Sequence, residues 1–185
     1  GFVNLKIKSS LWSQEIPKIL KAGMNYGRNS IGSGATLNVE FVSANPTGPL
    51  HAAHARGAVF GDALAGLMEF CGWNVTREYY INDAGSQVDV LARSLYLRYC
   101  EALGQQIGDI PTGLYPGHYL KDIGVAFATK VGGLYLNKPE SDWLEILRQF
   151  AIDAIMKLIK QDLLALGVNI DIFSSERSLV DSGAV

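Results

Sequence analysis

Hydrophobic and polar residues follow two different periods along the chain, and these periods predict strands and helices in turn. Runs rich in β-branched and aromatic residues predict strands at residues 36–42, 74–81 and 168–173. Longer segments with helical spacing predict helices from about His51 to the stop at Gly72, and at residues 88–102, 118–131 and 141–166. Because strands alternate with long helices, we expect an α/β fold with parallel strands and flanking helices.

The helix predicted from about His51 has an unusual surface. Apolar residues at i, i+4 spacing form one stripe at Ala55, Val59, Ala63 and Leu67. Three glycines interrupt the same segment, and each costs about 1 kcal/mol relative to alanine in a helix. Local weakness is one interpretation. Close packing of small residues against a sheet or a ligand is the interpretation we favour for Gly57, Gly61 and Gly66.

The two ends of the chain carry weaker signals. Alternation in FVNLKIK, residues 2–8, predicts a short strand, and a modest helix is expected over Ser13–Ala22. The Gly-, Ser- and Asn-rich stretch Asn25–Gly34 is the best candidate for a linker. Ser141 is placed to cap the helix at 141–166, which we expect to end at Gly167.

Composition limits the kind of protein this can be. With 48% apolar and 18% charged residues, the 185-residue chain can bury a core of about one domain, and no segment predicts a transmembrane helix or a signal peptide. The missing initial Met suggests a piece of a longer chain. Two cysteines without a CxxC spacing predict free thiols and a cytoplasmic location. A net charge of −2 argues against a broad basic surface for RNA, so any RNA contact is expected to be local.

Two histidines one helical turn apart, His51 and His54, allow three interpretations. A metal site is disfavoured because zinc needs three or four ligands, and His118 is isolated. In a structural role, one histidine starts the helix and the other satisfies a backbone group. In the third, the order strand, Pro/Gly turn and helix N-terminus forms an anion site for a polyphosphate. The chain lacks GxGxxG and GxxxxGK[ST], which argues against the usual dinucleotide and P-loop sites.

The stretch NPTGPLHAAH, Asn45–His54, resembles the signature of class I aminoacyl-tRNA synthetases, which reads HIGH in its simplest form. Its flanks, VEFVSANPTGPLH, RGAVFGDALAGLMEFCGWNVTREYYINDAGSQV and DLLALGVNIDIFSSE, are similar to bacterial arginyl-tRNA synthetase over about residues 36–185. The resemblance implies the N-terminal half of a Rossmann-like nucleotide-binding domain. Residues 35–185 would be its first, incomplete part, and residues 1–34 the tail of an N-terminal tRNA-binding domain with a linker.

That family activates arginine with ATP and transfers it to its tRNA, so the resemblance implies arginine, ATP and an arginine tRNA as partners. It implies that His51 and His54 stabilise the phosphates in the transition state and that Gly48 and Ala53 also contact ATP. The implied arginine-binding residues are Glu40, Ser43, Asn45 and His51. The loop NDAGSQ supplies further pocket candidates, Asn82, Asp83 and Gln87, although Asp83 or Ser86 as a helix cap is the alternative. Magnesium is expected only with ATP, and no protein-bound metal is expected.

The chain departs from the family pattern at several points. Ala53 stands where the signature usually has Gly, which predicts a modest loss of ATP affinity. In YPGHY, residues 115–119, His118 stands where an acidic residue is common. A lysine-rich KMSKS-like loop is absent, so we expect the 185-residue chain alone to be inactive. The alternative is a non-catalytic RNA- or partner-binding module derived from the synthetase fold. No membrane partner is expected, and the oligomeric state stays open.

Overall fold

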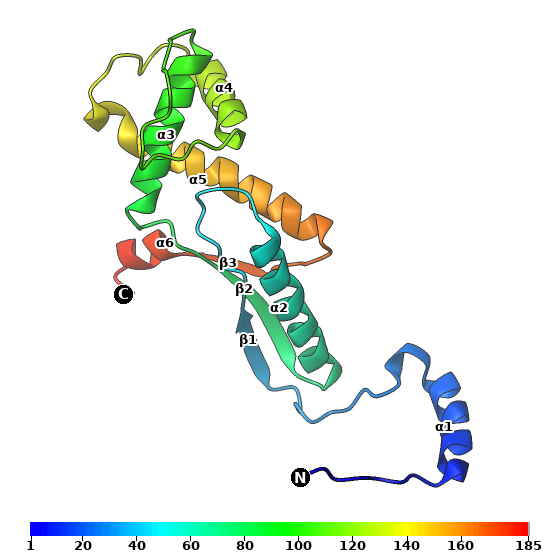
Figure 1. The fold of residues 1–185 in the computed structure, drawn as a ribbon. Helices are drawn as coiled ribbons and strands as arrows, with labels where there is room; N and C mark the ends of the chain where they lie inside the picture. The colour runs from blue at the N-terminus through cyan, green and yellow to red at the C-terminus, as the bar shows by residue number, and fades with distance from the viewer. Residues whose placement is uncertain (185) are drawn as a thin grey trace.

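The fold contains one three-stranded parallel sheet. The computed structural model describes residues 1–184. Its three strands lie in the order β1 (Thr36–Glu40), β2 (Asn74–Ile81) and β3 (Ile172–Ser175), with both neighbouring pairs parallel. Helix α2 (Ala52–Phe70) connects β1 to β2, and the other long helices lie between β2 and β3 in the sequence (Figure 1). The predicted α/β fold with parallel strands and flanking helices is therefore confirmed.

The first and last strands are shorter than predicted or shifted along the chain. The run predicted at 36–42 stops at Glu40, because Val42 and Ser43 turn into the left-handed region with φ of 66° and 40°. The last strand was predicted at 168–173 but pairs with β2 only from Ile172 onward. A short helix that was not predicted, α6 (Glu176–Asp181), follows directly, and its N-cap Ser175 accepts a hydrogen bond from the amide of Ser178 at 3.1 Å.

Helix α2 packs on the sheet through its smallest residues. The predicted stripe is wrong: Val59 and Leu67 are 54% and 63% exposed. The buried residues are instead Ala58, Gly61 and Ala65. A Cβ on Gly61 would lie 2.2 Å from Cγ of Phe41, so the helix sits too close to the sheet for a larger side chain there. The close-packing interpretation is thus confirmed for this glycine, whereas Gly57 and Gly66 face open space.

An ion-pair cluster also ties α2 to β2. Arg77 on β2 contacts Asp62 at 3.1 Å and Glu69 at 2.6 Å, both on α2. These contacts raise the pKa of the guanidinium, with the hydrogen bond to Glu69 as the main cause. Arg77 therefore holds the helix to the sheet with a largely buried side chain.

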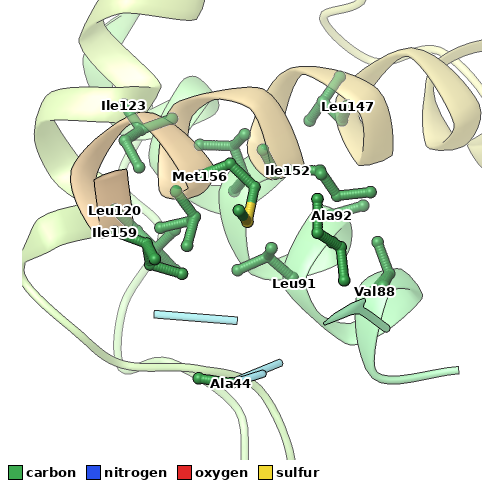
Figure 2. Packing of buried hydrophobic residues seen from close by; sticks show 14 of the residues in the cluster. Ala44, Val88, Leu91, Ala92, Leu120, Ile123, Leu147, Ile152, Met156 and Ile159 are labelled. Atoms are coloured by element: carbon green, nitrogen blue, oxygen red, sulfur yellow. The ribbon is translucent and has the colours of Figure 1, made fainter. Parts of the chain in front are cut away.

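Three helices build the main apolar core beside the sheet. These are α3 (Gln87–Ala102), α4 (Tyr119–Val131) and α5 (Glu140–Ala165), and Figure 2 shows their inward residues interdigitating. All three confirm predicted helices within one residue at each end. The predicted cap of α5 is wrong, since Pro139 occupies the N-cap position and the hydroxyl of Ser141 donates to Asp142. Cys100 lies buried in this core as a free thiol.

The N-terminal segment differs most from the prediction. Residues 2–8 form no strand; they are exposed, and no described strand lies beside them. Helix α1 (Ser9–Ala22) starts four residues earlier than predicted and is followed by the 3₁₀ turn η1 (Gly23–Asn25), and Figure 1 shows α1 standing apart from the sheet. The end of the predicted linker is hydrogen-bonded to the turn after α2: the amides of Gly32 and Gly34 each donate to a carbonyl there at 2.9 Å. Among residues 1–184, none of the helices combines the length and apolarity needed to cross a membrane.

Candidate functional site

The carboxyl end of β1 is a strained corner with polar side chains. Val42 is a β-branched residue at φ 66°, a conformation that persists only when surrounding contacts hold it. The amide of Ser43 donates to the carbonyl of Phe41 at 2.9 Å, and the hydroxyl of Ser43 accepts from the amide of Tyr80 at 3.0 Å. The same hydroxyl donates to the carboxylate of Glu40. This corner therefore brings two of the predicted arginine-binding residues, Glu40 and Ser43, into direct contact.

The loop after this corner is held by hydrogen bonds to β2 and to the first residue of α3. The buried hydroxyl of Tyr79 donates to the carbonyl of Ala44 at 2.8 Å. One residue later, the amide nitrogen Nδ2 of Asn45 donates to Oε1 of Gln87 at 2.9 Å. Asn45 and Gln87 are 42 residues apart in the sequence, and both were predicted for the pocket. The structure thus brings together the carboxyl end of β1 and the amino end of α3.

His51 and His54 form a stacked pair at the start of α2. His51 is the N-cap, and the two ring centroids lie 3.7 Å apart with an interplanar angle of 21°. The backbone amide of His51 donates to Nδ1 of His54 at 3.4 Å. Since Nδ1 accepts, the proton of neutral His54 lies on Nε2, which is left as a donor. Burial, and secondly the nearby His51, lower the pKa of His54, which favours the neutral form of the ring.

The N-terminus of α2 is electrostatically suited to an anion. Helix α2 has 19 residues and no acidic residue in its first turn, so the positive end of its dipole is not neutralised by its own side chains. A cavity of about 350 Å³ opens beside it, lined by Leu50, His51, Ala52, Ala55, Asp162, Ala165 and Leu166. Ala53, at the irregular position of the signature, is exposed. Within residues 1–184, no group of three or more His, Cys, Asp and Glu side chains is arranged to hold a metal ion.

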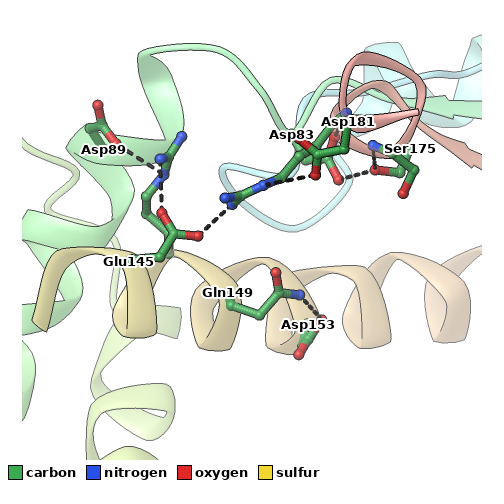
Figure 3. A network of polar contacts seen from close by, with 10 residues as sticks. Asp83, Asp89, Glu145, Gln149, Asp153, Ser175 and Asp181 are labelled. Carbon is green, nitrogen blue, oxygen red and sulfur yellow. Dashed lines mark hydrogen bonds and ion pairs between the residues drawn. The ribbon is translucent and has the colours of Figure 1, made fainter. Parts of the chain in front are cut away.

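Asp83 joins two strand ends. It is 8% exposed, and both carboxylate oxygens accept hydrogen bonds: Oδ2 from the hydroxyl of Ser175 at 2.6 Å and Oδ1 from the amide of Arg177 at 2.9 Å (Figure 3). Asp83 thus caps α6 rather than α3, and Ser86 at the N-cap position of α3 makes no side-chain capping bond. Asn82, the preceding residue, is partly exposed. Their contact with a substrate stays a prediction.

A chain of ion pairs begins at Arg177, the residue whose amide binds Asp83, and the sequence did not predict it. Arg177 contacts Glu145 at 2.5 Å, and Arg148 contacts both Glu145 at 3.1 Å and Asp89 at 3.0 Å (Figure 3). These contacts link α6, α5 and α3 around the carboxyl ends of the strands. Two pairs of this network are close in the sequence: Arg148–Glu145 at i,i+3 spacing and Arg177–Asp181, 3.9 Å apart, at i,i+4 spacing. These spacings are the signals that the sequence offers, because the other partners meet only through the fold.

A strand–turn–helix junction on a parallel sheet, with two histidines at an open helix N-terminus, is typical of α/β proteins that bind nucleotides. Comparison with known families then makes this class specific. A family profile described as "tRNA synthetases class I (R), catalytic domain" matches residues 15–178. The chain therefore belongs to the family of arginine-type class I tRNA synthetases. The match begins inside the segment predicted as N-terminal tail and linker, and the division at residues 34 and 35 stays a prediction.

Similar proteins agree with the family. The chain is 58% identical over 184 residues to an arginine--tRNA ligase of Nitrobacter hamburgensis, and the match covers 100% of this chain and 31% of that protein. It is 56% identical over 185 residues to an arginine--tRNA ligase of Ruegeria sp., covering 100% of this chain and 32% of the relative. A solved structure from Campylobacter jejuni, provisionally named an arginyl-tRNA synthetase, superposes with a TM-score of 0.79 at 34% identity and covers 95% of this chain and 38% of its own. The chain thus spans about a third of the length of the curated relatives.

Proposed function

We propose that this chain forms the first part of the catalytic domain of an arginine--tRNA ligase. In the complete protein, ATP activates arginine as arginyl-adenylate, and the arginine is then transferred to its tRNA. The attack of the arginine carboxylate on the α-phosphorus needs alignment and charge stabilisation more than covalent help. The 185 residues alone are expected to be inactive, since no KMSKS-like loop occurs in them.

The observation that carries the proposal is the stacked pair His51–His54 at the open N-terminus of α2. Nε2 of His54 is free as a donor because Nδ1 is occupied by the backbone amide of His51. A neutral donor beside the positive end of a helix dipole suits a polyphosphate, which gains charge on its oxygens in the transition state. Magnesium would enter with ATP and be held mostly by the phosphate oxygens.

Arginine would bind on the other side of the same loop. Glu40 is exposed at the carboxyl end of β1, where a carboxylate can accept from an ammonium or guanidinium group. Asn45 has its Nδ2 held by Gln87, which leaves Oδ1 to accept from the substrate. Glu40 and Ser43 contact one another, so a substrate cation and the serine hydroxyl would share one carboxylate.

The test replaces each histidine in the full-length protein and follows arginine-dependent exchange of pyrophosphate into ATP. His51→Ala and His54→Ala should each lower the activation rate by about 100-fold, because each stabilises charge in the transition state. An unchanged rate with reduced folding stability would favour the purely structural role of the pair. The 185-residue chain itself should charge no arginine tRNA, and measurable charging would refute its predicted inactivity.

A further inference from the structure

Tyr119, the first residue of α4, contacts the loop that leads into α2. Its hydroxyl donates to the backbone carbonyl of Thr47 at 2.6 Å, across 72 residues of sequence. Thr47 lies between Asn45 and His51, the candidate arginine-side and phosphate-side residues. Tyr119 therefore connects the helical layer to the middle of the candidate site.

The segment before Tyr119 is held firmly on α3. The amide of Tyr115 donates to the hydroxyl of Ser94 at 2.9 Å, and the guanidinium of Arg98 donates to the carbonyl of Pro116 at 3.2 Å. Arg98 is only 7% exposed, so this bond lies in the interior. Helix α4 itself is pressed against α3, since a Cβ on Gly124 would lie 2.7 Å from the carbonyl carbon of Arg98. The segment that contains Tyr119 is therefore held in a fixed position on α3.

Two glycines make room for this ring. A Cβ on Gly117 would lie 2.1 Å from Cε1 of Tyr119, so the ring covers that glycine with no space for a methyl group. On the loop side, a Cβ on Gly48 would lie 3.2 Å from the hydroxyl oxygen of Tyr119. Close approach on both sides leaves the tyrosine one position, with its hydroxyl directed at the loop.

We propose that Tyr119 is a positioning residue for the phosphate side of the site. It holds Thr47 and Gly48, and through them the approach of the chain to His51 at the N-terminus of α2. Among residues 1–184, the backbone from Thr47 to Leu50 makes one other hydrogen bond to a residue outside this range, from the amide of Thr47 to the carbonyl of Asn45 at 2.7 Å. Asn45 has anchors of its own, since its side chain donates to Gln87 and Tyr79 donates to the carbonyl of the preceding residue, so it depends less on Tyr119 than Gly48 and His51 do. The inference rests on the proposed function.

Tyr119→Phe tests the inference because it removes only the hydroxyl. In the full-length protein, arginine-dependent pyrophosphate exchange should show kcat/KM for ATP reduced about 10-fold, whereas KM for arginine should change by less than about 2-fold. The matched control is Tyr99→Phe. The buried Tyr99 donates to the carbonyl of Gly132 at 2.8 Å and accepts from the amide of Tyr135 at 3.2 Å, so Tyr99→Phe loses the same kind of donor bond and one more, without touching the loop.

A second variant protects the test against misfolding of the first. Gly117→Ala keeps the hydroxyl but displaces the ring, and it should reproduce the selective fall in kcat/KM for ATP. Wild-type kinetics in Tyr119→Phe, or equal losses for ATP and arginine, would overturn the inference while the proposed function stands. A wild-type protein without arginine-dependent exchange would overturn the proposed function and the inference with it.

Discussion

Asn45 and Gln87 lie 42 residues apart in the sequence, yet Nδ2 of Asn45 donates to Oε1 of Gln87 at 2.9 Å. The bond joins the end of β1 to the first residue of α3 and fixes which end of the Asn45 amide faces the site. With Nδ2 occupied, Oδ1 is the acceptor offered to a substrate cation. Gln87 therefore acts through Asn45, and its contribution should depend on the acceptor oxygen alone.

Gln87→Met should weaken arginine binding by removing that acceptor while keeping the length of the side chain. We expect KM for arginine to rise about 10-fold in pyrophosphate exchange by the full-length protein, with KM for ATP changed less than about 2-fold. Gln87→Glu retains an acceptor oxygen and should stay closer to the wild type. Equal arginine KM values in Gln87→Met and the wild type would count against this role.

His54 predicts a pH dependence of stability. Its folded pKa is lowered from 6.5 by burial and by His51, so the unfolded chain binds more protons there as the pH falls below that value. The contribution is therefore fully present above about pH 6.5 and is lost as the pH falls toward the folded pKa. His54→Gln should reduce the drop in thermal midpoint between about pH 7.5 and about pH 5.5. The control is His118→Gln, at an exposed position, and an equal reduction there would contradict the prediction.

Gly61 should tolerate no side chain. Gly61→Ala places a methyl group 2.2 Å from Cγ of Phe41 and should lower the free energy of unfolding by about 2 kcal/mol, because α2 must move away from β1. Gly66→Ala, in the same helix but facing open space, should instead be neutral or raise it by up to about 1 kcal/mol. Urea denaturation of both variants measures the difference, and similar values for the two would argue against the close helix–sheet contact.

Asp83 should matter for the junction of β2 and β3. Asp83→Ala leaves the hydroxyl of Ser175 and the amide of Arg177 without their acceptor and should cost about 2 kcal/mol of unfolding free energy. Asp109→Ala, at an exposed loop position, is the control and should change stability by less than about 0.5 kcal/mol. A loss no greater than that of the control would show that Asp83 does not join the two strand ends.

Some of the site is local and could be predicted from the sequence. The order of strand, Pro/Gly turn and helix places His51 and His54 at a helix N-terminus, because the prolines and glycine of residues 46–49 exclude regular structure and the helical period resumes directly after them. The strand at residues 74–81 matches its prediction, since its β-branched and aromatic run lies between turn residues.

Long-range contacts decided the rest. The buried face of α2 differs from its apolar stripe because the distance to Phe41 admits only small residues. The short run at residues 2–8 has strand-like alternation but no described neighbour to pair with, so it forms no strand.

The sequence by itself determined the types of the long helices and of the three paired strands, the parallel α/β class and the residues that mark the family. It could not determine that both carboxylate oxygens of Asp83 accept hydrogen bonds, that Nδ2 of Asn45 donates to Gln87, or that the hydroxyl of Tyr119 donates to Thr47. These facts depend on hydrogen bonds between residues 42 to 94 positions apart. Periodicity describes only neighbours along one element, whereas such bonds form when separate elements pack together, so only the tertiary structure decided them.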